Sequence, residues 1–128
     1  MKTITEKALI KRITAAGYTA ESVTVNHGYY YDGTEHGENV PAVVVSVEYG
    51  ESIIPVVNVM EKAGYIVKWY FNTATAYTPA DYEHAENLDA IAIAFLDAFW
   101  KDLHENPEHK ENNAEQAINV GRLAISAL

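Results

Sequence analysis

The chain contains no cysteine among its 128 residues. This absence excludes disulfide bonds, thiolate metal ligands and cysteine nucleophiles. Because small secreted domains commonly depend on disulfides, a cysteine-free chain of this length favours a cytoplasmic protein. The first residues, MKTITEKALIKRITAAG, carry charges where a signal peptide needs an apolar core, and no run of eighteen apolar residues occurs anywhere. We therefore expect a cytoplasmic chain that neither enters nor spans a membrane.

Positive charge is also scarce. Nine basic residues stand against eighteen acidic ones, and the net charge of −9 is uneven: residues 73–128 carry −7 and residues 1–72 carry −2. Direct binding of nucleic acid needs a cationic surface, which this composition does not supply. The excess of carboxylates is explained either by solubility or by a basic protein partner.

Local signals predict a helix followed by a hairpin at the start of the chain. Thr3 or Thr5 can cap the helix, and Gly17 stands where a left-handed terminating residue is needed. The segments ESVTVNHGYYYD and AVVVSVEYG alternate apolar and polar residues with the period of a strand. Asp32-Gly33 between them is typical of a turn, so we expect the two strands to pair.

The middle of the chain predicts one more helix and one more strand. A helix from Glu51 to Lys62 accommodates Pro55 only if that proline lies in its first turn, and Gly64 ends it. The segment YIVKWYFN then alternates as a third strand, with Trp69 and Phe71 on one face and Tyr70 on the other.

The last third of the chain is predicted to be helical. Thr78 followed by Pro79 is a helix start, the helix runs to about Leu103, and Pro107 stops it. Its middle, AIAIAFLDAFW, is apolar almost all round, which indicates that more than one side is covered. Asn112 can cap a final helix. The apolar stripe of that helix contains small residues, which permit close helix packing. The stripe consists of Ala114, Ala117, Ile118, Gly121, Ile125 and Leu128.

These elements predict an α+β fold in the order α-β-β-α-β-α-α, with a three-stranded, largely antiparallel sheet packed against helices. The length fits a single domain, residues 1–128. Within it, residues 1–77 hold the sheet and residues 78–128 form an acidic helical part.

Two histidine-containing segments carry side chains that can ligate a metal ion. His27, Asp32, Glu35 and His36 lie on a strand and beyond its turn, so they would converge only if the loop folded back. In HENPEH, His104 and His109 are five residues apart and Pro107 separates them, so no single helix presents both as HExxH does. We expect no metal site and no cofactor.

Enzyme signatures are absent as well: there is no GxGxxG, no Walker loop and no GxSxG. We expect a non-enzymatic protein. Two alternatives stay open, a small ligand-binding or metal-dependent hydrolytic domain, and a homo-oligomeric structural subunit that associates through its C-terminal helix.

Tyrosines on the less apolar strand faces and carboxylates on the helices are the candidate binding residues. Tyrosine is enriched in interface cores because it joins a large apolar area to a polar group. Clustered carboxylates complement a basic groove or mimic the charge of nucleic acid. The residues predicted to bind a partner are Tyr30, Tyr70, Asp81, Glu83, Glu86, Asp89, Glu105 and Glu108.

In general style, as a compact acidic domain without a cofactor motif, the chain is similar to small inhibitors from mobile elements and to toxin-immunity proteins. No motif carries this likeness. The sequence thus favours an acidic protein-binding module, an inhibitor of immunity or anti-defence type that blocks a larger, basic, nucleic-acid-handling partner.

Overall fold

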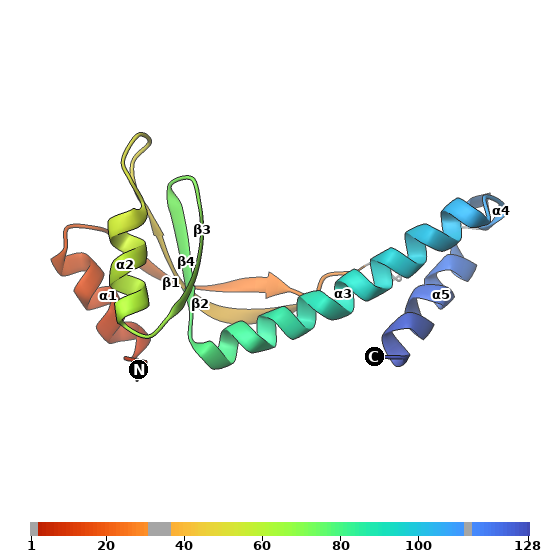
Figure 1. The fold of residues 1–128 in the computed structure, drawn as a ribbon, viewed down its shortest axis with the longest axis horizontal. Coiled ribbons are helices and arrows are strands. Elements are labelled where there is room, and N and C mark those ends of the chain that lie inside the picture. The colour runs from red at the N-terminus through yellow and green to blue at the C-terminus, as the bar shows by residue number, and fades with distance from the viewer. Residues whose placement is uncertain (1–2, 31–36, 112–113) are drawn as a thin grey trace. The chain divides into compact units, whose positions relative to one another are not determined.

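The computed structural model describes residues 3–30, 37–111 and 114–128, and Figure 1 shows its helices and strands. Along the chain the elements are α1 (Glu6–Ala15), β1 (Ala20–His27), β2 (Glu38–Ser46), α2 (Ile54–Lys62), β3 (Ile66–Tyr70), β4 (Thr73–Tyr77), α3 (Pro79–Glu105), α4 (Glu108–Glu111) and α5 (Glu115–Ser126). The predicted α+β class is confirmed.

The sheet has four strands in the order β1-β2-β4-β3, so the predicted three-stranded sheet is wrong by one strand. The missed strand is β4, which pairs antiparallel with both β2 and β3. A two-residue turn, Phe71-Asn72, joins β3 to β4, because Tyr70 pairs directly with Thr73. Neither turn residue is a glycine or proline, and the TATAY segment has little apolar bulk, so Asn72 is the only residue in this connection that signals a turn.

Packing divides the chain into two compact units. Unit 1 comprises Met1–Val25 and Val40–His84, and unit 2 comprises Asn26–Asn39 and Ala85–Leu128. Each unit is described by itself below.

The core of unit 1 lies between one face of the sheet and the helices α1 and α2, which lie side by side in Figure 1. Ala74 and Ala76 of β4 are fully buried and stand opposite Val45 and Val43 of β2. Their small side chains leave room for larger residues from the two helices. These fully buried helical residues are Leu9, Ile13, Val56 and Met60.

The predicted cap and terminating glycines of the unit 1 helices are confirmed, but α2 begins at Ile54, three residues after the predicted start at Glu51. Thr5 caps α1, since its Oγ1 accepts a hydrogen bond from the Ala8 N–H at 3.2 Å. Pro55 lies in the first turn of α2. Gly17 and Gly64 adopt φ values of 95° and 91°, a region that residues with a Cβ rarely occupy. Short-range chemistry therefore sets where these helices stop.

The start of α3 also follows the prediction, because the Thr78 Oγ1 accepts a hydrogen bond from the Asp81 N–H at 3.2 Å. The helix extends to Glu105, two residues beyond the expected end and just before Pro107. The proposed cap Asn112 lies outside the described residues. Ala114, in the left-handed region with φ of 58°, directly precedes α5.

Unit 2 is built around Phe95, a fully buried residue of α3. The Tyr30 ring lies 4.9 Å from the Phe95 ring, between centroids, and the Phe99 ring lies 5.9 Å from it. Gly121 of α5 meets the same ring: a Cβ at this position would stand 2.6 Å from Phe95 Cδ2. The small-residue stripe of α5 thus allows close packing, at Gly121, within the chain itself.

None of the helices in the described part of the chain combines the length and the apolar character needed to cross a membrane.

Tyr65 gives unit 1 a pH-dependent contact. Its hydroxyl donates to the Ile4 carbonyl oxygen at 2.9 Å. Burial, and then the carboxylates of Glu6 and Asp81, raise the Tyr65 pKa above its usual 10.0. Because the folded protein holds this proton more tightly than the unfolded chain, the stabilisation is complete below pH 10.0 and is lost as pH rises toward the folded pKa.

We expect Tyr65→Phe to lower the free energy of unfolding by about 1 kcal/mol at neutral pH, because the hydrogen bond is lost. The variant should also lose less stability than the parent as pH rises above 10.0. Urea unfolding at both pH values measures this, with Tyr18→Phe, at the edge of the same core, as the control. If Tyr65→Phe loses as much stability as the parent above pH 10.0, Tyr65 is not the source of the pH dependence.

We expect Gly121→Leu to lower the free energy of unfolding by about 1–3 kcal/mol, because the added side chain meets the buried Phe95 ring. Gln116→Leu, on an exposed position of the same helix, is the matched control and should change stability by less than about 0.5 kcal/mol. Thermal and urea unfolding compare the two. Equal effects of the two substitutions would show that α5 does not pack closely on Phe95.

Candidate functional site

Four exposed aromatic side chains gather at one end of unit 1. The exposed fraction is 98% for Tyr49, 50% for Trp69, 74% for Tyr70 and 73% for Phe71. Tyr49 lies in the connection between β2 and α2, and the other three lie at the end of β3 and in the β3–β4 turn (Figure 1). We call these four residues the aromatic tip.

Backbone pairing places the side chains of the tip on both faces of the sheet. Trp69 stands opposite Ala74, whose side chain is in the core, and Tyr70 stands opposite Thr73 on the other face. Asn72 fixes the turn to the end of β2: its carbonyl accepts from the Val47 N–H at 2.8 Å, and its side-chain amide donates to the Val47 carbonyl at 2.7 Å. Two hydrogen bonds therefore hold the β3–β4 turn of the tip to the end of β2.

Phe71 adopts a φ of 52°, in the left-handed region. A residue with a Cβ is strained there by about 1–2 kcal/mol, and glycine or asparagine is the usual occupant. Its ring contacts the Tyr70 ring, with 4.3 Å between centroids, and is otherwise largely in solvent. Strained, exposed residues are concentrated at functional sites, so Phe71 is a candidate for binding.

Two open hollows flank the tip. One, of about 430 Å³, is lined by residues 68–73 and Thr75, and the other, of about 300 Å³, is lined by residues 49–52 with Phe71 and Asn72. Phe71 and Asn72 border both hollows. Open hollows beside aromatic side chains can receive single side chains of a partner protein.

The structure separates the two predicted tyrosines. Tyr70 is exposed at the tip in unit 1. Tyr30 packs on Phe95 in unit 2 and is only half-exposed, so it contributes to the core of that unit. The predicted first strand ran through Tyr30, but β1 ends at His27, so strand alternation does not apply to Tyr30.

The predicted carboxylates differ in their surroundings. Glu83, Glu86, Glu105 and Glu108 are exposed. Asp81 is half-buried in the first turn of α3, where a carboxylate is stabilised by the positive end of the helix dipole. Asp89 is engaged within unit 2, as described next.

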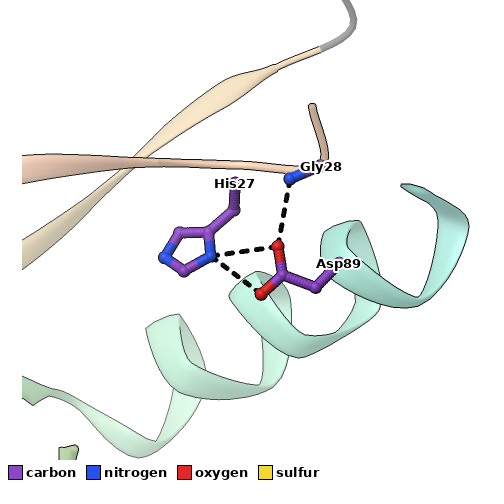
Figure 2. Close-up of polar contacts among 3 residues, drawn as sticks. All are labelled: His27, Gly28 and Asp89. Atoms are coloured by element: carbon purple, nitrogen blue, oxygen red, sulfur yellow. Dashed lines mark hydrogen bonds and ion pairs between the residues drawn. The ribbon is translucent and has the colours of Figure 1, made fainter. Parts of the chain in front are cut away.

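Asp89 binds the end of β1, as Figure 2 shows. Its Oδ2 lies 3.0 Å from His27 Nδ1, and its Oδ1 accepts a hydrogen bond from the Gly28 N–H at 3.1 Å. Gly28 has a φ of 73°, and a Cβ there would stand 3.0 Å from the Leu88 Cβ. The glycine therefore permits a close approach of this segment to α3, and Asp89 holds it in place.

A second imidazole–carboxylate pair closes the turn after α3, where His109 Nδ1 lies 2.6 Å from Asp102 Oδ2. His104, by contrast, is exposed. Among the described residues no group of three or more histidine and acidic side chains is arranged to hold a metal ion. Asp32, Glu35 and His36 lie outside the described residues. The two pairs fix backbone segments, and the ligand-binding or hydrolytic alternative stays a prediction.

Charge is distributed unequally between the two units. Residues 26–39 and 85–128 hold eleven acidic and three basic residues, a net charge of −8, whereas residues 1–25 and 40–84 hold seven acidic and six basic, a net charge of −1. Unit 2 therefore carries most of the negative charge of the chain.

The sequence-based list of binding residues omitted Tyr49, and it omitted Trp69 and Phe71, which were placed on the strand face opposite that of Tyr70. The signal for Phe71 was the asparagine beside it, because asparagine is common in tight turns. Nothing local marks Tyr49, which becomes part of the tip only through the fold.

If Phe71 is strained by its backbone, Phe71→Asn should raise the free energy of unfolding by about 1 kcal/mol, and Phe71→Val should lower it by a similar amount. Urea unfolding of the two variants measures the difference. A lower stability of Phe71→Asn than of the parent would show that the aromatic ring stabilises the fold more than the strain destabilises it.

Comparisons with protein-family models, with curated proteins and with solved structures give no significant match to this chain. Any inference about function therefore comes from the surfaces and charges described above.

Proposed function

We propose that the chain is a non-enzymatic protein-binding module that docks onto a larger basic protein and inhibits it. The observation that carries this proposal is the aromatic tip, four exposed aromatic residues around the β3–β4 turn. Isolated exposed apolar residues are ordinary on protein surfaces, but contiguous exposed apolar patches commonly mark interaction sites.

The tip has the composition of an interface core. Tyrosine and tryptophan supply much of the binding energy in interfaces, because their large apolar area is buried while a polar group keeps a hydrogen bond. The tip also requires little ordering on binding, since Asn72 already fixes its turn to β2. A strained phenylalanine at its apex is consistent with selection for contact with a partner rather than for stability.

The negative charge of the chain predicts a positively charged partner. A chain with a net charge of −9 is attracted to a cationic protein, and this attraction speeds association at low ionic strength. Proteins that handle nucleic acid present cationic surfaces to phosphates. A carboxylate-rich chain can occupy such a surface, and blocking it is the inhibitory action that we propose.

The experiment uses the tagged full chain to capture partners from its native host, followed by purification of the captured protein and titration calorimetry. We expect a basic partner whose affinity falls as salt is raised. Trp69→Ala and Tyr70→Ala should each weaken binding at least about tenfold, as removal of a central interface aromatic does. Glu83→Lys and Glu86→Lys should weaken binding mainly by slowing association.

Ile66→Thr is the matched control, because Ile66 is an exposed apolar residue on β3 that lies away from the tip. The affinity of this variant for the partner should equal that of the parent. Tyr30→Ala is unsuitable, because its loss would disturb the packing on Phe95. Unchanged affinity in Trp69→Ala, Tyr70→Ala and both charge reversals would exclude the proposal.

A further inference from the structure

A second surface lies on α3, in unit 2. Six residues of this helix are spaced alternately by four and three positions, and all six are exposed: Glu86, Ala90, Ile93, Asp97, Trp100 and His104. This spacing places side chains on one stripe of a helix and is the spacing of a helix-pairing seam. We call these six residues the α3 seam.

The seam departs from the sequence-based expectation that the middle of α3 is covered on more than one side. Ile93 and Trp100 are exposed by 58% and 62%. On the opposite side of the helix, Phe95 is fully buried against α5. The apolar character of AIAIAFLDAFW is thus explained on one side by packing within unit 2 and is left unexplained on the side of the seam.

We propose that the α3 seam pairs with the same seam of a second copy of the chain, with the two helices antiparallel. An antiparallel pairing centred between Ile93 and Asp97 sets Ala90 of one copy opposite Trp100 of the other, on both sides of the two-fold axis. The smallest side chain of the seam then faces the largest one. The ends of the seam set Glu86 opposite His104, so no two carboxylates face each other.

The flanking residues agree with this register. Leu96, half-exposed beside the seam, meets its own counterpart near the axis. Asp97 stands opposite Ile93, and Lys101, four residues further along α3, is exposed on the same side of the helix. A polar residue within a pairing seam lowers the affinity and specifies one register. A net charge of −9 on each copy also opposes association, so raising the salt concentration should strengthen the dimer.

This salt dependence is opposite to the one expected for a basic partner, so the dimer and the proposed function can fail independently. The first test is the molar mass of the full chain in solution, measured over a range of protein concentrations. We expect a concentration-dependent dimer. Trp100→Ala should raise its dissociation constant at least about tenfold. Trp69→Ala, at the aromatic tip, is the matched control and should leave the dimer intact.

The double exchange Ala90→Trp/Trp100→Ala tests the register, because it restores the pairing of small with large residues. We expect it to dimerise more tightly than either single variant. A chain that is monomeric at all concentrations would overturn the proposal, and so would a dimer that Trp100→Ala leaves unchanged.

Cysteine chemistry tests the orientation, since the natural chain has no cysteine. In Ala90→Cys/Trp100→Cys the two thiols of one helix are about 15 Å apart along its axis, too far for a bond within the chain. Mild oxidation, at a protein concentration above the dissociation constant of Trp100→Ala, should therefore give a disulfide-linked dimer. Ala90→Cys alone should link far less, whereas efficient linkage of this single variant would show parallel pairing and overturn the proposed orientation.

Discussion

The close packing of α1 and α2 on one face of the sheet is the constraint on which unit 1 depends. It requires small residues at the centre of the sheet, and Ala74 and Ala76 of β4 meet this need between the valines of β2 and the outer strand β3. β4 pairs on both of its sides, with β2 and with β3, and therefore lies inside the sheet. Phe71 lies in the turn that joins this inner strand to β3.

Local chemistry made much of the fold predictable. The cap of α1 at Thr5, the terminating glycines Gly17 and Gly64, the position of Pro55 and the start of α3 at Thr78 all follow from interactions within a few residues. The strand β4 was not predictable in this way. Its alanines are buried because the helices approach closely, and that approach is a property of the whole unit.

The candidate surfaces were predictable only in part, for the same reason. Alternation correctly placed Tyr70 away from Val67 and the core, but the aromatic tip also needs Tyr49, which comes from another connection. The carboxylate of Asp89 looked like a surface charge in the sequence, yet it holds His27 and Gly28 over sixty positions away in the chain. Contacts between distant segments decide which polar residues remain available to a partner.

The position of the β3–β4 turn has a further consequence. Along β3 and β4 toward the turn, Trp69 opposite Ala74 is the last residue pair that includes a core residue. The turn lies beyond this pair. Residues 71 and 72 can therefore be exchanged for other short turns that keep the link to Val47, while the hydrophobic layer beneath stays the same. The scaffold would then accept connections of different sequence at this end of the sheet without any rearrangement of its interior.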